Sequence, residues 1–190
     1  MTGRHGDSAA RPLRIGISGG GDEADTHALE LAARLGAALA RAGAVVVCGG
    51  LGGVMRAAAE GAVAAGGLTI GILPGPRAAD ANPWITIPIV TDLGHARNVV
   101  LVQTAEALVA IRGSHGTLSE IALALKIGVP VAAIDSFEAH RADHPPLAVE
   151  RCGGPEEAAA WALAAARARR AVSPGRETSG GRETPRGAAG

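Results

Sequence analysis

Short apolar segments alternate with longer amphipathic segments along most of the chain. The short segments are rich in Val, Ile, Leu and Ala and are apolar at successive positions, which is typical of strands buried on both faces. Such strands occur mainly in parallel sheets that are covered by helices. The predicted strands are Leu13–Ser18, Ala44–Cys48, Thr69–Leu73, Ala107–Ile111 and Val129–Ile134.

The segments between these strands carry the start and stop signals of helices. A helix over Thr26–Ala42 follows Asp25, a good N-cap residue, and ends before Gly43. Two more helices, over Gly53–Ala65 and Thr117–Ile127, also end at glycines. Strands joined by helices of this length imply right-handed crossovers. The predicted fold class is therefore α/β, a Rossmann-like doubly wound parallel sheet in a single domain.

The length of 190 residues suits one substantial core and is short for two ordinary domains. Residues 1–11 and 173–190 are polar and lack periodicity, so both ends are predicted to be disordered, and residues 12–172 are predicted to form the domain. Within the second end, Gly-Arg-Glu-Thr occurs at Gly175 and again at Gly181, which indicates low complexity.

Charge and composition exclude several classes of function. The formal net charge is zero and the charges are interspersed, which disfavours nucleic acid as a partner. No apolar run approaches the roughly 18 residues of a membrane span, so a cytoplasmic protein with no membrane contact is predicted. Cys48 and Cys152 form no paired motif, and we expect no disulfide, no metal site and no cofactor. Lys126, the only lysine and by pattern buried within a helix, disfavours pyridoxal-phosphate chemistry.

Glycine-rich segments follow the first two predicted strands. Because the carboxyl ends of parallel strands meet at one sheet edge, we expect these loops to converge. Glycine lets backbone N–H groups approach a phosphate closely, although a single such loop is more simply a tight turn. Neither loop matches the dinucleotide fingerprint, so a nicotinamide cofactor is disfavoured. The residues expected to bind the phosphate of a small nucleotide-like ligand here are Gly19, Gly20, Gly49, Gly50, Gly52 and Gly53.

A second candidate segment lies where the strand ending at Ile111 gives way to a helix. Thr117 offers a hydroxyl and an N–H at the positive end of the helix dipole, and Glu120 follows one turn later. The same two residues also fit a capping box, in which the glutamate bonds back to the helix start. Spacing alone leaves both interpretations open. Together with Thr117, the residues of this loop expected at the phosphate are Gly113, Ser114 and Gly116.

Arg97 stands at the polar start of a predicted helix whose continuation, Val99–Val102, is apolar nearly all round and is expected to be buried. An isolated arginine is usually a solvated surface charge. An arginine that starts a buried helix beside glycine loops is instead a candidate clamp for a phosphate or carboxylate. His95 and His115 are weaker candidates for the same site.

Four motifs make a family resemblance visible over about Leu13–Ser136. The sequence resembles the LOG-like, or SLOG, superfamily, some of whose members were labelled possible lysine decarboxylases, a label that the lone lysine disfavours. The motifs that carry the resemblance are Val47–Met55, Gly71–Gly75, Gly94–Asn98 and Gly116–Lys126.

The resemblance to LOG enzymes, which are nucleoside 5'-monophosphate phosphoribohydrolases, implies that Arg97 and Glu120 are catalytic. Gly113, Gly116 and Thr117 would then hold the phosphate while the N-glycosidic bond is hydrolysed to a free base and ribose 5-phosphate. The same branch also resembles carriers of molybdenum cofactor, which bind a phosphorylated pterin without cleaving it, and a nucleotide-sensing protein is a third alternative. The resemblance further implies a homodimer or a higher homo-oligomer, with a dimer as the favoured prediction.

Three positions depart from the enzyme motifs. Arg112 and Ser114 stand where the LOG enzymes have proline and glycine, and Asn98 replaces the lysine that usually follows the arginine. Ser114 and Asn98 support the carrier and sensor alternatives, while the phosphoribohydrolase remains the leading prediction from the sequence.

Overall fold

The computed structural model describes residues 11–137, 143, 145 and 148–172. The predicted disordered ends, apart from Arg11, lie outside the described residues.

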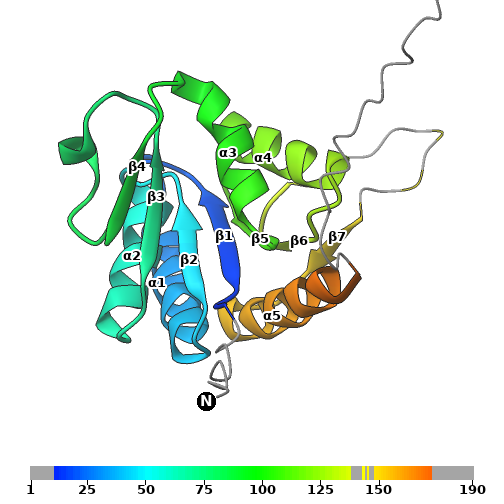
Figure 1. Cartoon of the computed structure of the whole chain (residues 1–190). Coiled ribbons are helices and arrows are strands. Elements are labelled where there is room, and N and C mark those ends of the chain that lie inside the picture. Colours follow the sequence, from blue (N-terminus) through cyan, green and yellow to red (C-terminus); the bar gives the residue numbers. More distant parts are fainter. Residues whose placement is uncertain (1–10, 138–142, 144, 146–147, 173–190) are drawn as a thin grey trace, which may run out of the picture.

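A single seven-stranded sheet runs through the molecule in the order β4-β3-β2-β1-β5-β6-β7, and every neighbouring pair is parallel (Figure 1). The parallel α/β prediction is thus confirmed. The strands are β1 (Arg14–Gly19), β2 (Val45–Cys48), β3 (Thr69–Leu73), β4 (Ile87–Val90), β5 (Ala107–Ile111), β6 (Val131–Ile134) and β7 (Val149–Arg151).

Helices cover both faces of this sheet, as a doubly wound fold requires. One buried cluster joins α1, α2 and α5 to the sheet, and a second joins α3 and α4 to the opposite face (Figure 1). The short 3₁₀ turns Ala78–Asp80 and Gly94–Ala96 complete the described elements. The helices are α1 (Thr26–Arg41), α2 (Gly53–Ala64), α3 (Arg97–Thr104), α4 (His115–Lys126) and α5 (Pro155–Val172).

Most predicted ends of helices and strands agree with the structure within two residues. The local interactions that set the helix ends are visible in the structure. The Asp25 carboxylate accepts a hydrogen bond from the Ala28 N–H at 2.8 Å and so caps α1. Gly43 and Gly128, just past α1 and α4, adopt φ of 76° and 72°, the left-handed conformation that ends helices.

Two expectations about burial were wrong. Lys126 is exposed at the last position of α4 instead of buried within a helix, which suits its favourable interaction with the helix carbonyl end. Val99 is 40% exposed, so α3 buries only the side that carries Leu101 and Val102 against the sheet. The second error came from reading an apolar run as burial on all sides.

The strand order fixes where a ligand site can form. From β1 the chain crosses to β2 on one side, whereas β5 pairs with the other side of β1. Such a reversal leaves a crevice outside the carboxyl ends of the two strands. The loops after β1, β2 and β5 therefore meet at one place, which we call the carboxyl edge.

Candidate functional site

A cavity of about 170 Å³ opens at the carboxyl edge. It lies among the loop after β1, the end of β2 and the N-terminal turns of α3 and α4, four segments that are distant in the sequence. Of the predicted site residues, seven line it, and six others complete the lining. The predicted ones are Gly19, Gly49, Arg97, Ser114, Gly116, Thr117 and Glu120; the others are Ile17, Ser18, Gly21, Met55, His95 and Asn98.

Arg97 and Glu120 face each other inside this cavity. Nη1 of Arg97 lies 3.9 Å from Oε1 of Glu120, and the two side chains are only 12% and 9% exposed. The other carboxylate oxygen of Glu120 accepts a short hydrogen bond from the Ser18 hydroxyl, which lies at the end of β1. A buried charge is costly unless it is compensated, and these two contacts compensate Glu120 only in part.

Burial sets the ionisation of this pair. Removal from water raises the pKa of Glu120, and the Ser18 hydrogen bond and the Arg97 charge oppose this rise without cancelling it. Desolvation likewise lowers the pKa of Arg97 from its ordinary value, against the opposing charge of Glu120. A carboxyl group with a raised pKa can exchange a proton with a bound ligand nearer to neutral pH than an ordinary glutamate.

Three sets of donors at the cavity have hydrogen-bonding capacity that no described residue uses. Nη1 of Arg97 and Oγ1 of Thr117 are buried and make no hydrogen bond. Helix α4 begins at His115 after an Ser114 N-cap whose side chain makes no capping bond. Because the first N–H groups of a helix carry its positive dipole end, this arrangement is suited to an anion, above all to a phosphate.

Two glycines make room for the functional side chains. The Cα of Gly49 packs against the Arg97 guanidinium, so that a Cβ at this position would overlap it. Gly113 has φ of 101°, a conformation that other residues rarely adopt, and a Cβ there would overlap the Thr117 hydroxyl. Neither could be replaced by alanine without moving Arg97 or Thr117.

Five glycines that were expected at the phosphate do not line the cavity. Gly53, with φ of 59°, packs against the carbonyls of the loop after β1, and the Gly20 carbonyl accepts the Val54 N–H at 3.0 Å. The Val54 N–H in the first turn of α2 is therefore already used by backbone. The five are Gly20, Gly50, Gly52, Gly53 and Gly113.

The capping-box alternative for Thr117 and Glu120 is wrong. Helix α4 starts two residues before Thr117, and the carboxylate of Glu120 bonds to Ser18 instead of to the helix start. Thr117 consequently lies within the first turn, where it lines the cavity and its buried hydroxyl makes no hydrogen bond with a described residue.

Sequence reasoning missed Ser18 and underrated Asn98. Asn98 is 7% exposed and lines the cavity. The available signal was its position directly after Arg97 at the start of a helix. Ser18 lies near the carboxyl end of the buried strand β1, beside the switch point of the sheet. A hydroxyl group in that position was the signal that could have identified it as a site residue.

Neither cysteine lines the carboxyl-edge cavity. Both are free and buried, and desolvation raises the pKa of Cys48, at the end of β2, to about 11, so its thiol stays protonated. Across the described ranges, no group of three or more His, Cys, Asp or Glu side chains is placed to hold a metal ion. No helix there is long and apolar enough to cross a membrane.

This fold defines a Rossmann-like protein with a cavity at its switch point, and comparison with known proteins gives the family. Residues 12–158 match the SLOG cluster4 family, and the chain belongs to it. An uncharacterised protein of Archaeoglobus fulgidus is 47% identical over 123 residues, which cover 64% of this chain and 80% of that protein.

Two solved structures resemble the whole domain. The molybdenum cofactor binding protein of Rippkaea orientalis is 35% identical with a TM-score of 0.75, over 82% of this chain and 98% of that one. The molybdenum cofactor carrier protein of Chlamydomonas reinhardtii is 32% identical with a TM-score of 0.70, over 81% and 98%.

Proposed function

We propose that this chain binds molybdenum cofactor or a closely similar phosphorylated pterin, and that the carboxyl-edge cavity holds the phosphate. The observation that carries the proposal is the convergence of unused donors in one cavity, namely Nη1 of Arg97, the Thr117 hydroxyl and the uncapped start of α4. The similarity to two molybdenum cofactor binding proteins over nearly their full length supports the choice of ligand.

The chemistry of binding follows from these groups. Phosphate oxygens accept hydrogen bonds from the first N–H groups of α4 and from the Thr117 hydroxyl, while Arg97 supplies a planar charged donor. A phosphate beside Glu120 would repel its carboxylate, so the ligand favours the protonated form, which the raised pKa already brings closer to neutral pH. Glu120 thus serves in this proposal as a proton-accepting neighbour of the bound anion.

The cavity is large enough for only part of the proposed ligand. At about 170 Å³ it is smaller than the roughly 300–1,000 Å³ of sites that enclose a whole organic ligand. It suits a phosphate group and the atoms next to it. The pterin would lie outside, beyond the rim formed by Ser114 and the exposed His95.

Binding is tested by incubating the full chain anaerobically with the phosphorylated pterin and measuring co-elution of pterin fluorescence in gel filtration. We expect Thr117→Val to weaken binding about tenfold, because it removes one hydrogen bond to a charged group. It should not lower the free energy of unfolding, since the Thr117 hydroxyl has no partner in the described structure. Thr104→Val, a matched change on α3 whose hydroxyl bonds to the Val100 carbonyl, should leave binding unchanged. Equal binding by all three proteins would contradict the site.

A phosphoribohydrolase is the second candidate, and the placement of Arg97 and Glu120 in one cavity favours it. In that function Glu120 would orient water or stabilise positive charge on the ribose. Incubation with AMP and related monophosphates, followed by assay of ribose 5-phosphate, separates the two functions. Release that is lost in Glu120→Gln supports the hydrolase; tight binding with no release supports the carrier.

We further propose that the chain forms a homodimer through β4 and the start of α3. Three apolar side chains in this region are exposed: Ile87 (45%), Leu93 (51%) and Val99 (40%). Burial of these side chains against a second copy of the chain would stabilise a dimer. Light scattering should give twice the chain mass, and Val99→Glu should shift it toward one chain. A cytoplasmic location remains a prediction from the sequence.

A further inference from the structure

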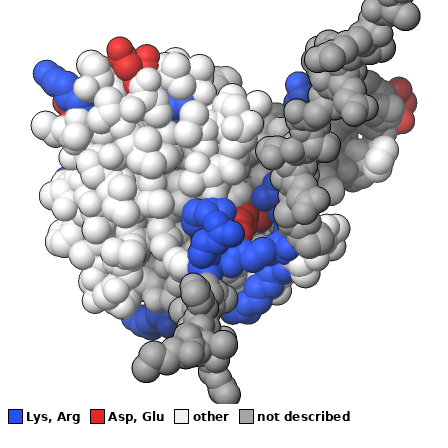
Figure 2. Space-filling model, viewed as in Figure 1, with Lys and Arg blue, Asp and Glu red and all other residues white. Residues whose placement is uncertain are grey.

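Arginines gather at the edge of the sheet opposite the ligand cavity, which we call the amino edge. Although the chain as a whole has no net charge, Figure 2 shows Lys and Arg side chains concentrated on one area around an acidic group. They come from both ends of the domain, the start of β1 and the end of α5 (Figure 1). The residues of this arginine cluster are Arg11, Arg14, Arg167, Arg169 and Arg170.

One carboxylate, that of Glu106, contacts the cluster, and its hydrogen-bonding capacity is used. Nε and Nη2 of Arg170 donate to its two oxygens at 2.7 and 2.6 Å. The backbone N–H of Arg14 donates to one of them at 2.9 Å. Glu106 also lies 3.7 Å from Nη2 of Arg14, so among the described residues its charge is shared by Arg14 and Arg170 and does not reach the other arginines of the cluster.

The other bonds of the cluster go to backbone carbonyls. Arg14 and Arg169 donate to Thr104 and Ala105 at the end of α3. Arg170 also donates to the Arg11 carbonyl at 2.6 Å. These carbonyl contacts fix the guanidinium groups without adding a counterion, and in the described part of the chain Glu106 is the counterion of Arg14 and Arg170.

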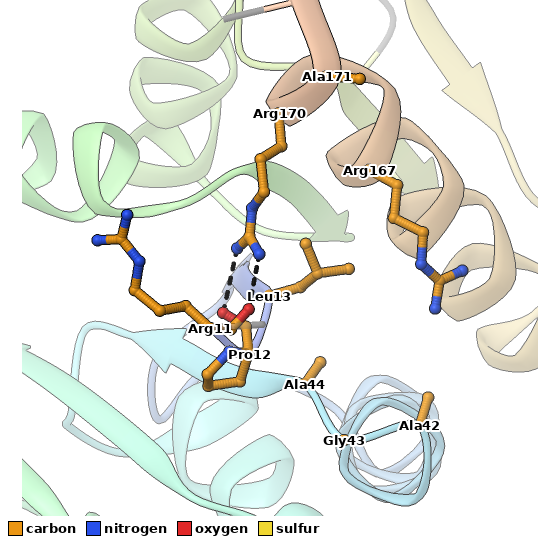
Figure 3. A pocket seen from close by; sticks show the side chains of 9 residues that line it. All are labelled: Arg11, Pro12, Leu13, Ala42, Gly43, Ala44, Arg167, Arg170 and Ala171. Atoms are coloured by element: carbon orange, nitrogen blue, oxygen red, sulfur yellow. Dashed lines mark hydrogen bonds between the residues drawn. The ribbon is translucent and has the colours of Figure 1, made fainter. Parts of the chain in front are cut away.

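Arg11 and Arg167 are the members whose guanidinium groups have no recorded partner in the part of the chain that the structure describes. Both line a hollow of about 460 Å³, and Figure 3 shows their side chains on either side of Arg170. The hollow has the volume of a small-ligand site. Its other lining is small and apolar: Pro12, Leu13, Ala42, Gly43, Ala44 and Ala171.

We propose that this hollow is a second binding site, for a small molecule that carries two or more oxyanion charges. Arg11 and Arg167 flank the hollow on opposite sides of Arg170, and a molecule with oxyanion groups at two places would supply each of them with a counterion (Figure 3). Guanidinium groups donate in pairs to phosphate or carboxylate oxygens, and the apolar lining accommodates the uncharged part of the molecule. The site shares no residue with the carboxyl-edge cavity, so both can be occupied together.

Calorimetric titration of the full chain with inorganic pyrophosphate tests this second site. Arg97→Ala removes the carboxyl-edge site and should leave one binding event per chain. In that background, Arg11→Ala with Arg167→Ala should weaken the remaining event at least about tenfold, the usual loss when hydrogen bonds to a charged group are removed. Thermal stability without ligand should be unchanged, because both side chains are exposed and neither has a partner among the described residues.

A matched double variant, Arg34→Ala with Arg77→Ala, removes the same charge from arginines that are already paired with Glu156 and Asp80. It should bind pyrophosphate as the Arg97→Ala parent does. Equal weakening in both double variants would overturn the site, because binding would then follow net charge alone. Absence of any binding event in the Arg97→Ala protein would overturn it as well, without touching the proposed function.

The chemical source of the charge is resolved by repeating the titration with citrate. Binding of pyrophosphate alone assigns a phosphorylated ligand, and binding of both assigns an oxyanion of either kind. Binding of poly-glutamate without binding of either small anion would overturn the proposal in favour of an acidic protein partner.

Discussion

Two buried glutamates, each beside arginine, lie at opposite edges of the same sheet and are treated differently by the fold. Glu106 at the amino edge receives three hydrogen bonds of 2.6–2.9 Å from Arg14 and Arg170. Glu120 at the carboxyl edge receives one, from the Ser18 hydroxyl, and its arginine stays 3.9 Å away. Their burial is similar, with side chains 11% and 9% exposed.

The difference separates a structural carboxylate from one available to a ligand. A buried glutamate whose oxygens are satisfied ties its partners together, here the start of β1 and the end of α5. A buried glutamate with unused capacity, whose arginine partner lies 3.9 Å away without a hydrogen bond, costs stability, and such costs collect at functional sites. Each variant below should affect one edge and spare the other.

The largest effect is expected for Arg97→Ala on ligand binding. Loss of a buried charged donor should cost about 2–3 kcal/mol, roughly 30- to 150-fold in the dissociation constant of the phosphorylated pterin. Arg97→Lys should bind with intermediate affinity, because it keeps the charge without the planar fork. Undiminished affinity in the alanine protein would remove the carboxyl edge from the binding site.

The next largest effect is expected for Glu106→Gln on stability. It leaves two arginines without their counterion, and because these are 37–40% exposed the cost should be about 2 kcal/mol, less than for a fully buried pair. Urea unfolding measures it. Glu156→Gln, which breaks the exposed pair with Arg34, should change the unfolding free energy by less than about 0.5 kcal/mol. Equal losses would show that Glu106 is not a structural tie.

A smaller and pH-dependent effect is expected for Glu120→Gln. Because the folded-state pKa of Glu120 is raised, its contribution to stability is present below its ordinary pKa of 4.5 and is lost as the pH rises through the folded value. Glutamine does not titrate, so the stability of the variant relative to the wild type should increase with pH across that window. Each unit of pKa shift is worth about 1.4 kcal/mol. Unfolding curves that keep a constant separation from pH 4 to pH 8 would contradict the raised pKa.

The smallest effect is expected for Ser18→Ala. The Ser18 hydrogen bond lowers the pKa of Glu120, so its removal should raise that pKa further and move the pH dependence of ligand binding to higher pH. We expect a shift in the midpoint of the binding–pH profile and a loss of about 1 kcal/mol or less in unfolding free energy. A profile identical to that of the wild type would mean that Ser18 does not set the ionisation of Glu120.

The central strands could be predicted because they are buried on both faces. Nearly every position in them is therefore apolar, and a short run of apolar residues is visible in the sequence. The strands that were missed lie at the edges of the sheet. All four residues of β4 are exposed, and β7 spans only Val149–Arg151. Exposure and shortness remove the periodicity on which a strand prediction depends.

The location of the candidate site could be predicted from the sequence, but most of the contacts within it could not. Arg97, Thr117 and Glu120 stand at the starts of helices, where local sequence carries a signal. The roles of Gly49 and Ser18 depend on partners far along the chain: Ser18 and Glu120 are 102 residues apart. Local spacing does not distinguish a glycine that contacts a ligand from one that makes room for a distant arginine.

The hydrogen bonds from Arg170 to the Arg11 and Pro12 carbonyls place the first and last described turns of the domain side by side. A short linker between these turns, with new ends opened at Gly66, would give a circular permutant that keeps every strand pairing of the sheet. Anchoring the protein to a sensor surface through either end would leave the ligand cavity facing solution. The same attachment would crowd the arginine cluster. A sensor prepared in this way would therefore detect binding at the carboxyl edge more readily than binding at the amino edge.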